Sequence, residues 1–207
     1  MRVMLMPDKF KGSLTAAGVR TAMAEGMHAV FPEAKIIGFP ASDGGDGFLE
    51  VVRSVREVQS LQVVVEDPLG RQRRAPLLMD AGSREAFVEM ARASGMELLA
   101  ASERNPLRTH TRGTGQLIWE ALHKGATRVY IGLGGSATND GGCGIASVFG
   151  YRFLDARGRD LEPVGGNLHR IARILPPEDR ALWEKAELTA VNDVANPLSG
   201  PKGAAHV

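Results

Sequence analysis

The feature that most constrains the fold is a glycine-rich segment, Gly132–Gly144, which holds six of the chain's 25 glycines. It follows the apolar stretch Arg128–Ile131, which is typical of a buried strand, and it leads into a helical stretch that ends near Phe149. Glycine tolerates backbone conformations that side chains forbid, so the cluster indicates a tight turn. A turn at a helix N-terminus presents successive backbone amides to an anion such as phosphate. A packing turn that needs glycine only for space is the alternative.

Comparison of the glycine-rich segment with three known glycine-containing motifs limits the kinds of ligand site that it can form. The segment lacks the Gly-Lys-Ser/Thr end of a Walker A loop, because Asn139 and Asp140 occupy those places. The Gly-x-Ser-x-Gly elbow of hydrolases fails at Thr138. The dinucleotide pattern Gly-x-Gly-x-x-Ala fits Gly132–Ala137, with Asp155 at a suitable distance, so an NAD-dependent dehydrogenase is one alternative. The Asp140 carboxylate would repel a pyrophosphate unless a cation intervened, and Mg²⁺ bound to a nucleoside triphosphate is such a cation.

Carboxylates and lysines recur where other predicted strands end. Asp8 and Lys11 follow the first strand, Asp43 follows the second, and Asp193 follows the last. In open α/β sheets, ligands bind outside the carboxyl ends of the strands. We therefore expect these loops to converge with the glycine-rich segment on one site, although an isolated Asp-Gly turn is usually structural.

The order of the predicted elements indicates an α/β fold in two parts. The chain opens with strand Val3–Met6, helix Leu14–Val30, strand Lys35–Phe39 and helix Phe48–Val55, with Ser13 or Thr15 able to cap the first helix. Two strands, Val58–Glu66 and Arg73–Asp80, then flank a turn and predict an antiparallel hairpin. We expect residues 1–58 to be the first part of a Rossmann-like or flavodoxin-like parallel sheet, and 59–207 to be a second, mixed α/β domain.

The second part is predicted to continue with helices at Glu85–Ala93 and Gln116–His123, and with strands at Arg128–Ile131, Tyr151–Leu154 and Leu188–Val191. After the last strand, residues 196–203 have the composition of a loop. A chain that stops while leaving a loop is expected to be truncated.

Composition excludes several classes of function. The 207-residue chain is 43% hydrophobic and 24% charged, which is typical of folded globular proteins. Lys and Arg number 25 against 24 Asp and Glu, so no basic field is present to hold nucleic acid. No apolar stretch approaches the ~18 residues of a membrane helix. The single cysteine, Cys143, excludes an internal disulfide and fits the cytoplasm. We expect no nucleic-acid or membrane partner, and the oligomeric state stays open.

Taken together, the motifs resemble one family, the bacterial glycerate kinases of the larger, non-sugar-kinase type. The segments that carry the resemblance are Pro7–Leu14, Asp43–Gly47, Asp67–Gly70, Arg104–Leu107, Gly113–Gly115, Gly134–Gly142, and Asp193 with Asn196–Leu198. The string Gly-Gly-Ser-Ala-Thr-Asn-Asp-Gly-Gly is the most specific. The resemblance implies ATP-dependent phosphorylation of glycerate to phosphoglycerate. An NAD-binding dehydrogenase and an inactive nucleotide-binding fragment remain the alternatives.

Phosphoryl transfer needs positioning and charge neutralisation, and this assigns roles to the candidate residues. The nucleotide phosphates are expected on the backbone and hydroxyls of Gly134, Gly135, Ser136, Ala137 and Thr138. Lys11 would neutralise the transferring group, and Asp8 or Asp43 would be the base. Arg104, before Arg112, would bind the carboxylate of glycerate. Asp140 and Asp193 are the candidates for Mg²⁺. Which hydroxyl of glycerate is phosphorylated stays open.

Three residues depart from what the resemblance implies. The family commonly has Glu where Asp46 stands, an aromatic residue where Arg112 stands, and a small hydroxyl residue where His110 stands. These departures are expected to change the substrate pocket. The family also continues well beyond the last residue of this chain. The resemblance further implies that the sheet of the first domain is built from both ends of the full chain, with the middle domain inserted between them.

Overall fold

The computed structural model describes residues 1–10, 13–197 and 200–203. Its elements, in chain order, are β1 (Arg2–Leu5), α1 (Ala16–Val30), β2 (Lys35–Gly38), α2 (Phe48–Val55), β3 (Gln59–Glu66), β4 (Gln72–Asp80), β5 (Glu85–Glu89), α3 (Ala91–Ser94), the 3₁₀ turns η1 (Met96–Leu98) and η2 (Ala101–Glu103), α4 (Arg112–His123), β6 (Arg128–Gly132), α5 (Cys143–Val148), β7 (Arg152–Leu154), η3 (Gly165–Arg170), β8 (Arg173–Leu175) and β9 (Glu187–Val191).

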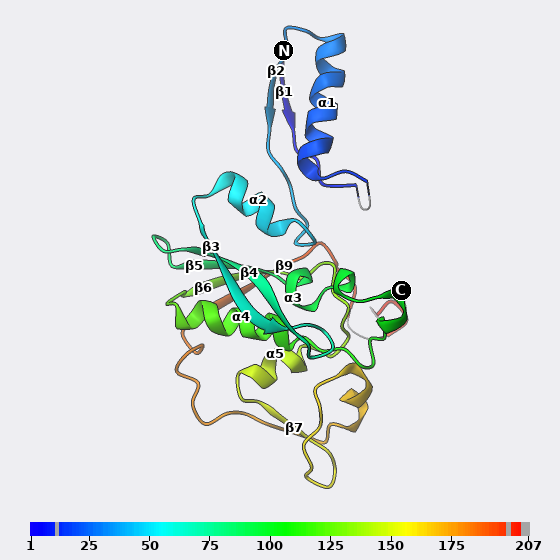
Figure 1. Ribbon diagram of the computed structural model, residues 1–207, viewed down its shortest axis with the longest axis vertical. Coiled ribbons are helices and arrows are strands. Elements are labelled where there is room, and N and C mark those ends of the chain that lie inside the picture. The colour runs from blue at the N-terminus through cyan, green and yellow to red at the C-terminus, as the bar shows by residue number, and fades with distance from the viewer. Residues whose placement is uncertain (11–12, 198–199, 204–207) are drawn as a thin grey trace.

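A five-stranded sheet forms the centre, in the order β3-β4-β5-β6-β9 (Figure 1). β3 and β4 form the predicted antiparallel hairpin, and β4 pairs antiparallel with β5. β5, β6 and β9 run parallel to one another. The α/β fold class with a parallel-containing sheet is therefore confirmed.

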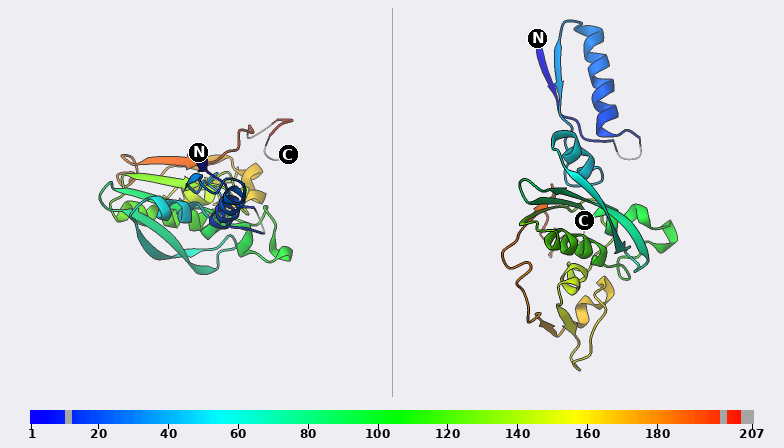
Figure 2. Two further views of the ribbon diagram at one scale, coloured as in Figure 1. Left: turned by 90° about the horizontal axis from the view of Figure 1, so that it is seen from above. Right: turned by 60° about the vertical axis from the view of Figure 1, so that its left-hand side comes forward.

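Helices cover both faces of this sheet. On one face, α2 packs Phe48, Leu49 and Val52 against Leu78 and Phe87 of the sheet. On the other face, α4 contributes the larger core, whose fully buried residues include Leu117 and Ile118. Each large apolar side chain that is fully buried contributes about 1.5–3 kcal/mol to folding. The five-stranded sheet lies between α2 and α4 (Figure 2, right).

The β1–α1–β2 unit stands away from the five-stranded sheet (Figures 1 and 2). β1 and β2 pair in parallel as a separate two-stranded sheet, as the βαβ order predicts. Thr15 caps α1, because its Oγ1 accepts a hydrogen bond from the amide of Gly18 at 3.1 Å. The boundary near residue 58 stays a prediction; α2, which precedes it in the chain, packs on the five-stranded sheet.

The helix predicted at Glu85–Ala93 is wrong over most of its length. Residues 85–89 form β5, all five of them buried, and only Ala91–Ser94 is helical. The segment lies between β4 and β6 with both of its faces covered, so it shows no apolar–polar alternation that would distinguish a strand from a helix. The predicted helix at Gln116–His123 exists but begins earlier, at Arg112.

Candidate functional site

Three parallel strands end at the same level of the sheet. Glu89 of β5 is in register with Gly132 of β6, and Gly132 is in register with Val191 of β9. Polar loops follow β6 and β9, as the sequence predicts, whereas β5 leads through Met90 into the short helix α3. The carboxyl ends of parallel strands are the usual place for a ligand in an α/β fold.

The loop after β2 lies across these strand ends. The amide of Gly134 donates a hydrogen bond to the carbonyl oxygen of Gly44 at 3.1 Å, and the amide of Leu133 donates to Val191 at 3.1 Å. Gly44 adopts a φ of +86°, and a Cβ placed on it would lie 2.0 Å from the carbonyl oxygen of Val191. A side chain at this position would clash with backbone, so glycine is required for the two loops to meet.

The buried side chain of Glu89 anchors the loop that follows β2. Its Oε1 accepts a hydrogen bond from the amide of Gly47 at 3.2 Å, and its Oε2 accepts one from the amide of Leu49 at 3.0 Å. Arg92 pairs with Oε1 at 2.9 Å. Glu89 is 0% exposed, so these protein groups take the place of water around its carboxylate.

The loops after β1 and β2 are joined by an ion pair between Lys9 and Asp46. The Nζ of Lys9 lies 3.3 Å from Oδ2 of Asp46 and also donates a hydrogen bond to the carbonyl oxygen of the same residue. Their side chains are 17% and 30% exposed. The pair is therefore only partly screened by water, and it holds the two loops together.

A cavity of about 520 Å³ opens beside this ion pair, between the N-terminal end of α1 and α2. Its lining carries both signs of charge: the cations Lys9, Arg20 and Arg92, and the carboxylates Asp8, Asp46, Glu50 and Glu97. Pockets of 300–1,000 Å³ with a few placed polar groups are typical of small-molecule sites. Of the predicted site residues that the structure describes, Asp8 alone lines this cavity.

The glycine-rich loop is anchored by its own hydrogen bonds. The amide of Ala137 donates to the carbonyl of Ser94 at 2.9 Å, and the amide of Thr138 donates to Oγ of Ser136 at 3.1 Å. With Gly134 bonded to Gly44, three of the five predicted phosphate-binding amides are already used. Among the described hydrogen bonds, the amides of Gly135 and Ser136 have no acceptor. Of the groups predicted to bind phosphate, these two amides and the hydroxyls of Ser136 and Thr138 therefore remain.

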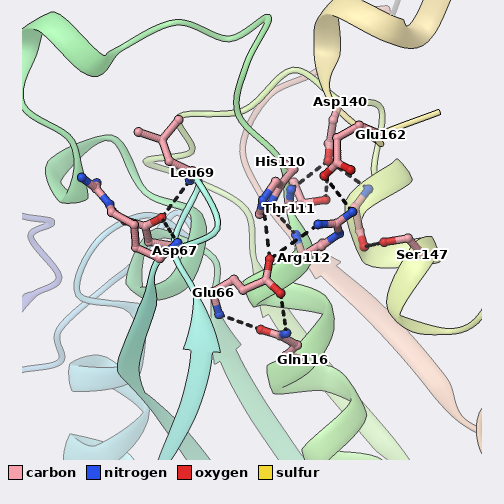
Figure 3. A network of polar contacts seen from close by, with 12 residues as sticks. Glu66, Asp67, Leu69, His110, Thr111, Arg112, Gln116, Asp140, Ser147 and Glu162 are labelled. Carbon is pink, nitrogen blue, oxygen red and sulfur yellow. Dashed lines mark hydrogen bonds and ion pairs between the residues drawn. The ribbon is translucent and has the colours of Figure 1, made fainter.

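Asp140 is buried at 1% exposure and surrounded by donors (Figure 3). Its Oδ2 accepts hydrogen bonds from the amide and the hydroxyl of Thr111, each at 2.8 Å, and from the amide of Gly144 at 3.0 Å. Its Oδ1 accepts from the amide of Gly142 at 3.0 Å. The carboxylate thus fixes the start of α5 and ties it to α4, which is the role of a helix cap.

The two candidate arginines lie elsewhere. Arg112 pairs with Glu162 at 2.7 Å and with Glu66 at 3.7 Å (Figure 3), and Arg104 is exposed. Neither lines the cavity. His110 lies in the same network as Arg112, with its Nε2 3.6 Å from Oε2 of Glu66. Burial, reinforced by the nearby Arg112 guanidinium, lowers the pKa of His110 below its ordinary value of 6.5.

The remaining predicted residues are scattered. Asp43 lies in the β2 loop, where its Oδ1 accepts a hydrogen bond from the amide of Gly45 at 2.7 Å. Asp193 is exposed after β9. Asp155 closes a turn by accepting hydrogen bonds from the amides of Arg157 and Arg159. Lys11 lies outside the described residues.

In the described ranges, no three His, Cys, Asp or Glu side chains come together in an arrangement that could hold a metal ion. No helix in the described part of the chain has the length and apolar character needed to cross a membrane.

Burial, and to a smaller extent the charge of Asp140, raises the pKa of the Cys143 thiol, which agrees with a packing role for that side chain.

Sequence reasoning missed Glu89, Arg92 and the role of Asp46. Glu89 falls within the segment predicted to be helical, where a glutamate is ordinary. Asp46 was visible within the Asp-Gly-Gly-Asp-Gly turn, but its partner Lys9 lies 37 residues away in the chain. No local pattern signals such a pair.

Loops that pack on the carboxyl ends of parallel strands beside a charged cavity define a mixed α/β protein with its candidate site at that edge of the sheet. The model of the glycerate kinase family matches residues 3–207. The chain belongs to this family.

Relatives and a solved structure agree. A protein named glycerate kinase from Bacillus subtilis (strain 168) is 42% identical over 207 residues, covering all of this chain and 54% of the relative. A glycerate 2-kinase from Escherichia coli (strain K12) is 38% identical over the same length, with the same shares. A crystal structure described provisionally as glycerate kinase 2 from Salmonella typhimurium LT2 superposes with a TM-score of 0.78 at 38% identity, covering all of this chain and 56% of the other. The chain spans about half the length of the curated relatives it matches.

Proposed function

We propose that this protein takes part in the ATP-dependent phosphorylation of glycerate in the cytoplasm. The observation that carries the proposal is the direct contact between two glycine-rich loops, at Gly44 and Gly134, on the carboxyl ends of three parallel strands and beside a cavity. Membership of the glycerate kinase family supplies the substrate class. Phosphoryl transfer depends on holding two substrates and neutralising charge, which is what loops at a sheet edge can do.

The nucleotide phosphates are proposed to lie on the glycine-rich loop. The amides of Gly135 and Ser136 are the two donors still available, and the hydroxyls of Ser136 and Thr138 lie 2.7 Å apart beside them. Gly134, Ala137 and Thr138 act by holding the loop in place through their own hydrogen bonds. A preformed arrangement of this kind needs little reorganisation when a phosphate arrives.

Glycerate is proposed to enter the cavity beside the Lys9–Asp46 ion pair. Arg92 faces this cavity and is held by Glu89 at 2.9 Å, so it is a better placed partner for a small carboxylate than Arg104 or Arg112. Arginine binds carboxylates through two parallel hydrogen bonds, which fixes the orientation of the acid as well as its position.

Magnesium is proposed to accompany the nucleotide, but Asp140 does not fit it. Both oxygens of that carboxylate are occupied by protein donors. Asp193 stays a prediction, as an exposed carboxylate after β9.

The test is glycerate-dependent release of ADP from ATP and Mg²⁺ by the purified protein, with the phosphoglycerate isomer identified by NMR. Calorimetric titration with ATP–Mg²⁺ and, separately, with NAD distinguishes the alternatives. NAD binding without ATP binding would support the dehydrogenase. ATP binding without turnover would support an inactive nucleotide-binding fragment.

Lys11 keeps its proposed role as the charge that meets the transferring phosphoryl group. Its replacement by alanine is expected to lower turnover on the order of 10²-fold while ATP affinity changes little, because the contact matters most in the transition state. Lys35→Ala, at an exposed position of β2, is the matched control. Equal losses of turnover and affinity in Lys11→Ala would assign the lysine to ground-state binding instead.

A further inference from the structure

We propose that Asp46 is the catalytic base of this site, the group that receives the proton of the acceptor hydroxyl. This inference rests on the proposed function and names the residue that performs its central step. It replaces Asp8 and Asp43, the two carboxylates that the sequence favours.

The first observation is the contact of Asp46 with the glycine-rich loop. A Cβ added to Gly135 would lie 2.7 Å from Oδ1 of Asp46 and 3.2 Å from its Cγ. Gly135 is exposed, has a φ of +72°, and carries one of the two amides available to a phosphate. A phosphate bound there would lie next to the Asp46 carboxylate, while Asp46 also lines the cavity proposed for the acceptor. Asp46 therefore stands between the two substrates.

The second observation is the way the carboxylate is held. Oδ2 faces Nζ of Lys9 at 3.3 Å, and Lys9 also bonds the backbone carbonyl of Asp46. The amide of the next residue, Gly47, is bonded to the buried Glu89 at 3.2 Å. The described hydrogen bonds leave Oδ1 without a donor, and the side chain is 30% exposed. One oxygen is thus fixed by a cation and the other is available to a substrate, the geometry that a general base needs.

The competing carboxylates are used differently. Oδ1 of Asp8 accepts a hydrogen bond from the amide of Lys9 at 2.6 Å. Oδ1 of Asp43 accepts one from the amide of Gly45 at 2.7 Å, and Asp43 does not line the cavity. Asp140 is saturated by four donors. Within the described part of the chain, Asp46 is the carboxylate of these loops that meets both the glycine-rich loop and the cavity.

The proposed step transfers the γ-phosphoryl group of ATP to a hydroxyl of glycerate. Oδ1 of Asp46 takes the proton from a hydroxyl of glycerate. At the same time, the oxygen of that hydroxyl forms a bond to the γ-phosphorus of ATP. The bond between the γ-phosphorus and the β–γ bridging oxygen breaks, and ADP leaves with the electron pair. Lys9 keeps the carboxylate oriented while charge builds up on the transferring group. The protonated Asp46 then returns its proton to water.

The experiment compares Asp46→Asn, Asp46→Glu, Asp8→Asn and Asp43→Asn with Glu57→Gln, an exposed carboxylate outside the site. Turnover with glycerate and ATP–Mg²⁺ is measured across pH, ATP affinity by calorimetry, and stability by thermal melting. Asp46→Asn is expected to lower kcat at least about 100-fold, with ATP affinity kept within about threefold. Asp46→Glu, which retains a carboxylate, should recover part of the rate. The acidic limb of the pH–kcat profile should disappear in Asp46→Asn.

Four results would overturn the inference. Near-normal turnover in Asp46→Asn, or a larger loss in Asp8→Asn or Asp43→Asn, would assign the base elsewhere. A lowered melting temperature with parallel losses of turnover and ATP affinity, unrelieved by Asp46→Glu, would make Asp46 a structural link between loops. Absence of glycerate-dependent ADP release from the unsubstituted protein would overturn the proposed function itself, and this inference with it.

Discussion

The buried carboxylate of Glu89, at the end of β5, accepts a hydrogen bond from the backbone amide of Leu49 in the first turn of α2 at 3.0 Å. The residue at the N-cap of α2, Gly47, has no side chain to cap the helix, and its φ is +92°. Glu89 therefore supplies the cap from 40 residues away in sequence, and its charge also opposes the positive end of the helix dipole. The same contact holds the loop that carries Asp46.

Replacing Glu89 by glutamine is expected to lower the free energy of unfolding by about 2–4 kcal/mol. The amide removes the charge that Arg92 neutralises and points an N–H group at backbone donors in a fully buried place. Chemical unfolding in urea measures the change. Glu50→Gln, which affects a 65% exposed side chain on the same helix, should change stability by less than about 0.5 kcal/mol. Equal effects of the two substitutions would contradict the capping role of Glu89.

Asp140→Asn is expected to destabilise the fold by about 3 kcal/mol, because the amide cannot accept all four hydrogen bonds that the carboxylate accepts. Asp160→Asn, at a surface ion pair with Arg152, is the control and should be close to neutral. Urea unfolding and calorimetry with ATP–Mg²⁺ are measured on both. Weakened magnesium-dependent binding with unchanged stability would restore the metal-ligand role of Asp140.

Burial of His110 predicts a loss of stability on acidification. Its pKa in the folded protein lies below the ordinary value of 6.5, mainly through burial and then through Arg112, against the opposing charges of Glu66, Glu162 and Asp140. As the pH falls through 6.5, the unfolded chain takes up a proton that the folded protein does not, so the free energy of unfolding decreases.

His110→Gln should remove this contribution. The variant is expected to lose less stability than the parent between about pH 7.5 and about pH 5.5. His169→Gln, at an exposed position, should follow the parent. An unchanged pH dependence in His110→Gln would mean that His110 takes up its proton equally in both states.

Amide hydrogen exchange should separate the two sheets. β1 and β2 form a pair with no further strand described beside them, whereas β6 lies between β5 and β9. A two-stranded sheet is marginal by itself, so the amides of Val3 and Met4 should exchange at least about tenfold faster than those of Val129 and Ile131. Equal protection would show that β1 and β2 belong to the same cooperative unit as β6.

Local patterns were sufficient for much of the fold. The period of apolar residues and the turn chemistry predicted the β3–β4 hairpin, β6, β9 and α2 within a residue or two, and Thr15 was one of two predicted caps for α1. β5 could not be predicted in this way, because a strand buried on both faces carries the same apolar run as a buried helix. Its identity depends on its neighbours β4 and β6, which lie elsewhere in the chain.

By itself, the sequence determined the α/β class, the glycine-rich turn after β6 and the resemblance to glycerate kinases, because glycine content, strand-to-helix order and specific strings are local properties. Only the tertiary structure decided which charged residues share one place. In the folded chain, Lys9 forms an ion pair with Asp46, and the Asp46 side chain lies against Gly135. The Asp140 carboxylate accepts hydrogen bonds from the amide and the hydroxyl of Thr111. Such contacts depend on strand register and loop packing, which bring together residues whose separation in sequence carries no signal of their proximity.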